Sequence, residues 1–238
     1  MILVVDSGST KTDWIALDNQ GQEIFSTQTL GLNPQMLSNE ILNERIKNNF
    51  EIYKNRKLVT KLFFYGAGCG IDSSQDRILK VFKSIFINSE FDIKEDTYAA
   101  VYSAVDIGTP SIVNIIGTGS NCSYYDGETV IQKVQSLGYV LMDYASGNYY
   151  GKYLIRAYYF NKMPESLRNE FAKNYDLSPN TIKNKLYREE NPNTYLAGFA
   201  KFLIDNKSNE YFREIIYKGL ERFIDYQVLQ YDDFSKVD

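Results

Sequence analysis

The hydrophobic positions in the first hundred residues predict a sheet with helices between its later strands. Residues 2–5 form a continuous apolar run, which is typical of a strand covered on both faces. Two further strand-like segments flank a polar turn at 18–21, so the first three strands are expected to form a meander. Strands are expected at residues 2–5, 12–17, 22–29, 61–65 and 91–94, and helices at 39–53, after a cap at Ser73 or Ser74, and at 96–105.

The opening pattern returns after the glycine and proline at 108–110. Residues 111–116 are again an apolar strand, followed by a small-residue turn and a hairpin with strands at 123–125 and 129–132. The segment VVDSGSTKTDWIALDNQGQEI is thereby echoed by NIIGTGSNCSYYDGETVI, which indicates an internal duplication. We therefore predict an α/β protein of two lobes, residues 1–108 and 109–238, whose equivalent turns would face each other across a cleft.

The second lobe does not complete the plan of the first. After Gly147 the pattern is almost wholly helical, with a serine–proline helix start at 178–179 and a long amphipathic helix at 209–231. The first lobe adds two more strands at the corresponding stage. We therefore expect the sequence to be a fragment in which the second lobe is truncated.

The composition excludes several classes of binding protein and enzyme. Lys plus Arg number 26 and Asp plus Glu 30, so the net charge is −4, and the chain lacks the basic run of a nucleic-acid or anionic-membrane binder. No apolar stretch approaches the roughly 20 residues that cross a bilayer, and the N-terminus does not resemble a signal peptide, so a cytoplasmic protein is expected. Histidine is absent, which excludes Ser-His-Asp and Cys-His catalysis and leaves a carboxylate, lysine or tyrosine as general base. Cys69 and Cys122 are expected to be reduced and buried.

Two glycine-bearing turns follow the strands that open the two lobes. In the first, Ser9 and Thr10 supply hydroxyls, Lys11 adds a positive charge, and Asp6 at the strand end suits a hydrated Mg²⁺. The second turn contains Thr118 and Gly119. Either turn alone could be a tight hairpin that merely needs small residues. Two such turns after equivalent strands indicate a clamp on the phosphates of a nucleotide.

Asp96 directly follows a short strand and opens a helix, in the segment KEDTYAA. It could simply cap that helix. A chain without histidine must also take a base for a substrate hydroxyl from such a group, and the two roles are compatible. Polar loops at 31–34 and 137–147 would suit a polyhydroxyl ligand, although their residues are also ordinary turn formers. The tyrosines between 149 and 159 favour a packed core over a ligand cage.

The segments DSGSTKTDW, GLNP, EDTYAA, IIGTGSNC and LGYVLMDYASG together resemble the N-acetylglucosamine kinase and BadF/BadG/BcrA/BcrD-type ATPase family. The resemblance implies the actin-like fold of two duplicated ribonuclease-H-like lobes and an ATP- and Mg²⁺-dependent kinase of an amino sugar. It leaves a homodimer open. It implies nucleotide contacts at Thr10, Thr118 and Gly198, a phosphate-motif acid at Asp6, and a catalytic aspartate at Asp96 that also meets the sugar. The amino-sugar contacts that it implies are Asn33, Ser120, Asn121, Ser136, Leu137, Gly138 and Asp143.

The chain departs from this family in one loop. Members usually read Gly-Asp-Glu-Gly-Ser-Gly where this chain has Met-Asp-Tyr-Ala-Ser-Gly at 142–147, which puts the floor of the sugar site in question. The adenosine-binding Gly-Ser motif would follow residue 238. Two other functions stay open: a non-catalytic sugar-binding or regulatory protein, and an ATPase activator of a dehydratase, which would hold an iron–sulfur cluster through cysteines. The sequence does not separate glucosamine, mannosamine and muramic-acid derivatives as substrates.

Overall fold

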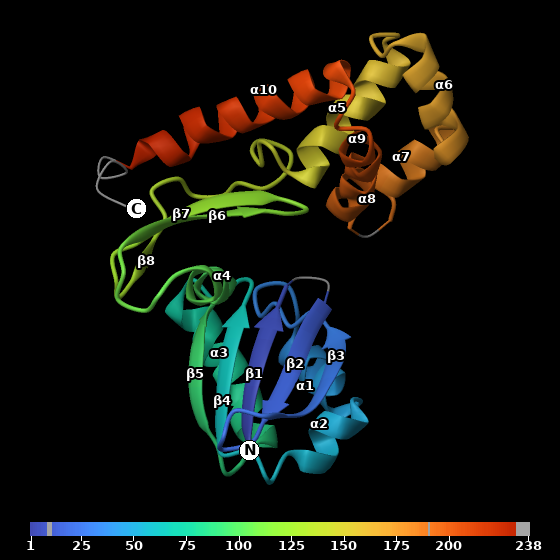
Figure 1. The fold of residues 1–238 in the computed structure, drawn as a ribbon. Coiled ribbons are helices and arrows are strands. Elements are labelled where there is room, and N and C mark those ends of the chain that lie inside the picture. The colour runs from blue at the N-terminus through green and yellow to red at the C-terminus, as the bar shows by residue number, and fades with distance from the viewer. Residues whose placement is uncertain (9–10, 190, 232–238) are drawn as a thin grey trace. The chain divides into compact units, whose positions relative to one another are not determined.

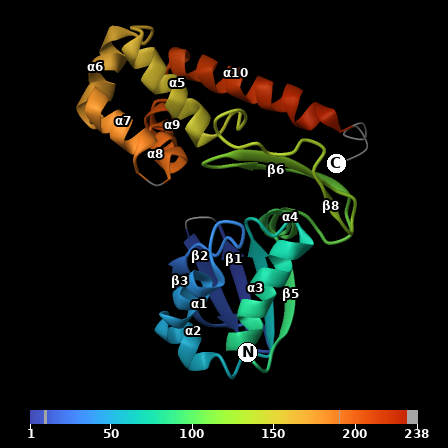
Figure 2. The same cartoon turned by 180° about the vertical axis from the view of Figure 1, so that it is seen from behind.

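The computed structural model describes residues 1–8, 11–189 and 191–231, shown from two sides in Figures 1 and 2. The chain divides into two compact units, Met1–Val105 and Asp106–Asp238. Each unit contains one sheet and several helices, so the structure is mixed α/β. None of the helices among the described residues is long and apolar enough to cross a membrane.

Unit 1 is built on a five-stranded sheet with the order β3-β2-β1-β4-β5. Its strands are β1 (Ile2–Ser7), β2 (Lys11–Leu17), β3 (Glu23–Leu30), β4 (Lys61–Gly66) and β5 (Glu90–Glu95). The first three form the predicted antiparallel meander, whereas β4 and β5 run parallel to β1. Parallel strands end at one edge of a sheet, so the residues that follow β1, β4 and β5 gather there.

The core of unit 1 lies on one face of this sheet. Helices α1 (Asn39–Lys47), α2 (Phe50–Asn55) and α3 (Asp72–Ile85) cover that face, as Figures 1 and 2 show, and α4 (Asp96–Ala104) follows β5. Alternate strand residues point into it, including Leu3, Val5, Trp14 and Phe64, all of which are essentially unexposed. Phe82 of α3 packs edge-on against Trp14 and Phe64 and fixes the helix on the sheet.

Two helix predictions need correction. The helix expected at 39–53 is two helices, because Asn49 caps α2 through Ile52 N and its amide donates to Thr27 Oγ1 and the Gln28 carbonyl of edge strand β3. These bonds satisfy groups that a continuous helix would leave unpaired. Neither Ser73 nor Ser74 caps α3, which begins at Asp72 after Ile71 without a side-chain cap, and Ser74 is buried.

Unit 2 combines a small sheet with a layer of helices. Among the described residues its sheet has the order β6-β7-β8 and is antiparallel throughout, formed by β6 (Ser111–Ile116), β7 (Ser120–Tyr125) and β8 (Val130–Ile131). The helices that follow are α5 (Gly147–Tyr159), α6 (Glu165–Asn174), α7 (Pro179–Tyr187), α8 (Pro192–Gly198), α9 (Ala200–Asp205) and α10 (Glu210–Tyr226), then a short 3₁₀ turn, Val228–Gln230. The predicted serine cap of α7 is confirmed, and the long C-terminal helix ends five residues earlier than expected.

The helices of unit 2 enclose an aromatic core. Within it the ring of Phe171 packs at a tilt against Phe199 and Phe202, and Phe202 packs edge-on against Phe212. Tyr231 ties the end of the described chain back to the sheet, because its hydroxyl donates to the Cys122 carbonyl at 2.9 Å. The small sheet and the helices therefore share one core.

Both cysteines are free and buried, as predicted. Cys69 belongs to the core of unit 1 and Cys122 to that of unit 2. Burial raises the pKa of the Cys69 thiol to about 12 and that of Cys122 to about 11, so neither is a thiolate near neutral pH.

Candidate functional site

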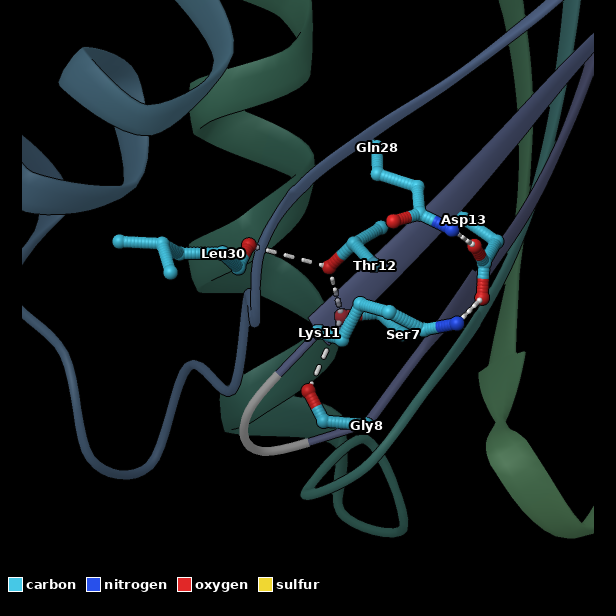
Figure 3. Close-up of polar contacts among 7 residues, drawn as sticks. All are labelled: Ser7, Gly8, Lys11, Thr12, Asp13, Gln28 and Leu30. Carbon is cyan, nitrogen blue, oxygen red and sulfur yellow. Dashed lines mark hydrogen bonds and ion pairs between the residues drawn. The ribbon is translucent and has the colours of Figure 1, made fainter. Parts of the chain in front are cut away.

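The first turn of unit 1 is anchored by a chain of buried hydroxyls (Figure 3). Ser7 Oγ and Thr12 Oγ1 share a hydrogen bond of 2.7 Å, and each also contacts a carbonyl: Ser7 that of Gly8 at 3.4 Å and Thr12 that of Leu30 at 3.2 Å. Ser7 Oγ in turn accepts from Leu32 N–H at 3.0 Å. Ser7 and Thr12 are fully buried. These hydrogen bonds hold the ends of β1 and β2 against the loop at 31–34.

The charged groups of this turn lie on the exposed side of the strands. Asp6 pairs across β1 and β2 with Asp13, and Asp13 is held by Lys11 Nζ at 2.8 Å and Gln28 Nε2 at 2.7 Å (Figure 3). Partial burial and the Asp13 charge raise the pKa of Asp6, against the lowering effect of Lys11. The predicted phosphate-binding lysine is thus paired with an aspartate in an exposed ion pair, which is weak enough to exchange partners. Ser9 and Thr10 lie outside the described residues.

Asp96 is the first residue of α4, and Glu95 rather than Asp96 holds the N-cap position, without a side-chain cap bond. The pKa of Asp96 is raised by burial and by the Asp6 charge, against the hydrogen bonds from the Thr97 and Asp96 backbone N–H groups. Asp6 and Asp96 therefore lie close enough to repel each other, at the edge where β1 and β5 end. A raised pKa brings a carboxylate nearer to the range in which a general base is effective.

A glycine-rich loop after β4 fits between two polar side chains of unit 1. A Cβ on Gly68 would lie 2.4 Å from Asn33 Oδ1, and Gly68 has a left-handed φ of +81°. A Cβ on Gly70 would lie 2.9 Å from Glu95 Oε1. These glycines allow Asn33, which is 8% exposed, and Glu95 to approach the same loop. The structure thus places Asn33, a predicted sugar contact, and Glu95, the residue before Asp96, against one loop.

The second turn, at 117–120, is bound to the loop that departs from the family pattern. Gly147 N–H donates to the Gly117 carbonyl at 2.8 Å, and Asn148 N–H donates to the Thr118 carbonyl at 3.0 Å. Ser120 Oγ donates to the Tyr144 carbonyl at 2.7 Å. The Ser120 hydroxyl therefore ties the 142–147 loop to the start of β7.

Asp143 lies at the centre of this arrangement. It is 6% exposed, its backbone is left-handed with φ +66°, and its Oδ2 accepts from Asn148 Nδ2 at 3.0 Å. A Cβ on Gly119 would lie 2.8 Å from the same oxygen. Gly119 is therefore needed for the carboxylate, in addition to any approach of a phosphate to the turn. Ala145, at the place of a family glycine, also has a left-handed φ of +61°.

Gly198 ends α8, which packs against the N-terminal half of α5. A Cβ on Gly151 would lie 1.8 Å from the Leu196 carbonyl oxygen, and one on Gly147 would lie 2.9 Å from the Ala197 Cβ and 3.3 Å from the Gly117 carbonyl. These two glycines let α8 approach closely. The predicted nucleotide residues at 118, 119 and 198 therefore belong to one packed region of unit 2.

The remaining predicted sugar contacts are more exposed. Ser136 and Leu137 lie on a loop that turns at Gly138, where φ is +80° and the carbonyl accepts from Met142 N–H at 2.9 Å. Lys152 of α5 donates to the Tyr139 carbonyl of this loop and feels the Asp143 charge, although burial dominates and lowers the pKa of Lys152. Asn121, on β7, accepts from Ser123 Oγ at 3.2 Å.

Several residues of the two sites were not singled out from the sequence. They are Ser7, Thr12, Gly68, Gly70, Glu95, Gly147, Asn148 and Gly151. The glycines could have been suspected from their positions beside strand ends and helix starts. The amide of Asn148 gave no sequence signal, because its partners are 30 and 5 residues away.

The donor set around Asp6 fits a magnesium ion. Among the described residues no group of three or more His, Cys, Asp or Glu side chains could hold a metal alone. Mg²⁺ is usually held by one or two carboxylates and takes its other ligands from water and phosphate. Asp6 and Asp96 are hard oxygen donors, and the Asp6 charge makes Asp96 harder to ionise, an effect that a bound divalent cation would relieve.

No protein-family model matches the chain, and no curated protein matches it. Among solved structures, a candidate N-acetylglucosamine kinase from Porphyromonas gingivalis is 28% identical and superposes with a TM-score of 0.88 over 98% of this chain and 82% of that one. A second candidate N-acetylglucosamine kinase, from Chromobacterium violaceum, is 14% identical with a TM-score of 0.67 over 93% and 79% of the two chains. A ROK family glucokinase from Streptomyces griseus, in complex with glucose and AMPPNP, is 17% identical with a TM-score of 0.50 over 93% and 89%. The two more distant structures share the fold, and the resemblance to N-acetylglucosamine kinases indicated by the sequence motifs is confirmed.

Proposed function

We propose that the chain is an ATP-dependent sugar kinase that transfers the γ-phosphoryl group to the C6 hydroxyl of an N-acetylated amino sugar, with N-acetylglucosamine as the first candidate. The observation that carries the proposal is the pair of carboxylates at the ends of β1 and β5, Asp6 and Asp96, each with a raised pKa. The similarity to the P. gingivalis protein supports the substrate class.

Asp96 is the residue proposed to act on the hydroxyl. Its carboxylate would accept the hydroxyl proton as the oxygen attacks the γ-phosphorus, which lowers the cost of forming the new ester bond. The two backbone N–H groups at the start of α4 hold the carboxylate in place through this transfer. Burial raises the pKa of Asp96 and so makes its carboxylate a stronger base.

The phosphates are assigned to the two turns. Asp6 would hold a hydrated Mg²⁺, which when bound neutralises charge on the phosphate oxygens. Lys11 would leave Asp13 for a phosphate, and the Ser9, Thr10, Thr118 and Gly119 segments would supply hydroxyl and backbone donors, with Gly198 near the nucleotide. We retain the assignment of two duplicated ribonuclease-H-like lobes, residues 1–108 and 109–238, as part of this proposal. Both observed sheets begin with an antiparallel meander, which supports it.

The sugar is assigned to Asn33, Asp96 and Asp143. Asn33 lies against Gly68 in unit 1, and Asp143 is fixed beside Gly119 in unit 2. Ala145 stands where the family has glycine, and its φ is left-handed, as is that of Asp143. The altered loop thus keeps a backbone conformation that suits glycine, which supports a functional sugar site. Cys69 and Cys122 are 0% and 1% exposed in the cores of the two units, which argues against the dehydratase-activator alternative, because a cluster held between subunits needs cysteines at the surface.

A substrate panel tests the proposal. The protein would be incubated with Mg-ATP and N-acetylglucosamine, N-acetylmannosamine, glucosamine, N-acetylmuramic acid or glucose, and ADP release would be measured for each. We expect turnover with an N-acetylated amino sugar above the ATPase background, and a product whose phosphorus couples to the C6 protons in NMR spectra. Sugar binding by calorimetry without turnover would instead establish the non-catalytic alternative.

A further inference from the structure

Asn148 occupies an unusual position at the start of α5. The side chain is fully buried, and its Nδ2 donates both to the Thr118 carbonyl at 2.6 Å and to Asp143 Oδ2 at 3.0 Å. Two acceptors on the nitrogen fix the orientation of the amide, because the opposite orientation would place its oxygen against both of them. One residue therefore joins the 117–120 turn to the Asp143 carboxylate.

This orientation leaves Asn148 Oδ1 buried without a hydrogen-bond partner within the described part of the chain. A buried acceptor that gives up water without a replacement bond destabilises the folded protein. The helix itself does not require the amide, because Ser146 already caps α5 by accepting from Tyr149 N–H at 3.2 Å. The contacts of Asn148 thus serve the two loops and not the helix end.

The same carboxylate is also confined by Gly119 and by its own backbone. Gly119 leaves room for Asp143 Oδ2, whose distance to a Cβ there would be only 2.8 Å. The Asp143 backbone is held by Ser146 Oγ, which donates to its carbonyl at 2.6 Å. With the main chain fixed in this way, the remaining freedom of Asp143 is rotation of its side chain, and the Asn148 amide removes it.

We propose that Asn148 is a positioning residue that holds the Asp143 carboxylate and the Thr118 carbonyl in one arrangement, and so orients the carboxylate toward the sugar. This inference rests on the proposed function, in which Asp143 contacts the amino sugar. Asn148 itself touches neither substrate. Its loss should weaken sugar binding through misorientation of Asp143, beyond any effect on folding.

The test is calorimetric binding of N-acetylglucosamine to the whole chain, with thermal unfolding measured in parallel. Asn148→Ala should weaken sugar binding at least tenfold. Tyr150→Phe is the matched control, because it removes a buried hydrogen bond of the same helix, from Tyr150 Oη to the Ile216 carbonyl at 3.0 Å, without touching Asp143. The control should lower the melting temperature and leave the sugar Kd within twofold of the original protein.

Asn148→Asp separates positioning from mere packing. Near pH 8 the new carboxylate faces Asp143, so sugar binding should be at least as weak as in Asn148→Ala. Near pH 5 the acid, whose pKa is raised by its neighbour, would carry a proton and donate to Asp143, so affinity should recover at least threefold. A Kd of Asn148→Ala within twofold of the original, or equal Kd values for Asn148→Asp at both pH values, would overturn the role of Asn148 alone. An original protein that binds no amino sugar would overturn the proposed function and this role together.

Discussion

Gly119→Ala is the substitution whose effect follows most directly from the geometry of unit 2. The added Cβ would lie 2.8 Å from Asp143 Oδ2 and 3.2 Å from its Cγ, closer than carbon and oxygen normally approach. Asp143 has little freedom to yield, because it is 6% exposed and bonded to Asn148. Overpacking of this kind costs about 1–3 kcal/mol. In a chain of this length each kcal/mol lowers the melting temperature by roughly 2–4 °C.

Gly117→Ala in the same turn is the control, since a Cβ there meets nothing within 4 Å. Thermal unfolding followed by far-ultraviolet circular dichroism should give a lower midpoint for Gly119→Ala and an unchanged one for Gly117→Ala. Gly119→Ala should also weaken binding of N-acetylglucosamine, because the carboxylate must rotate away from its amide donor. Equal stability of the two variants would show that the close packing of Gly119 on Asp143 is wrong.

Two further predictions concern unit 1. Asp6→Asn removes the like charge that raises the pKa of Asp96, so a carboxyl NMR titration should show a lower Asp96 pKa. A raised native pKa means that the folded protein binds the proton more tightly than the unfolded chain does, so the free energy of unfolding falls as the pH rises from the ordinary value of 3.8 through the native pKa. This fall should be smaller in Asp6→Asn. An unchanged Asp96 pKa in that variant would contradict the repulsion between the two carboxylates. Gly68→Ala adds a Cβ 2.4 Å from Asn33 Oδ1 at φ +81°, whereas its control Gly21→Ala has only the backbone strain of φ +80°. Unfolding followed by Trp14 fluorescence should therefore show Gly68→Ala to be less stable than Gly21→Ala by about 1–3 kcal/mol. Equal losses of stability would refute the steric contact.

Much of the fold was predictable because its signals are local. The apolar run at 2–5 and the turn at 18–21 determine the meander, and all five strands of unit 1 occur where the pattern places them. The break between α1 and α2 was not predictable, since it depends on Asn49 reaching strand β3, more than 20 residues earlier. The hydrophobic periodicity of a helix carries no information about a contact with a distant strand.

The site was predictable only in part for the same reason. Asp6 and Asp96 stand at strand ends, but position alone left Asp96 as readily a helix cap; the absence of histidine and the resemblance to the kinase family singled it out. Other contacts depend on loops that are distant in sequence and meet in space. These are the hydrogen bonds of Ser7 and Thr12, and the bonds from Asn148 to Thr118 and Asp143. Ser120 stays a predicted ligand contact, and the structure adds that its hydroxyl donates to the Tyr144 carbonyl. The residue type predicted a polar contact at Ser120, but only the structure identifies the Tyr144 carbonyl as the acceptor of its hydrogen bond.

The measurement that tests the central claim most directly is steady-state phosphoryl transfer by Asp96→Asn, with sugar binding measured by calorimetry. Asp92→Asn is the matched control, because Asp92 lies on β5, four residues before Asp96, and pairs with Lys94 at 3.6 Å. If Asp96 accepts the proton of the sugar hydroxyl, its substitution should lower kcat by about 10²–10⁴-fold while the sugar Kd stays nearly unchanged, and the control should keep most of its activity. An Asp96→Asn protein that retains more than about a third of the original kcat would contradict the assignment of Asp96 as the base.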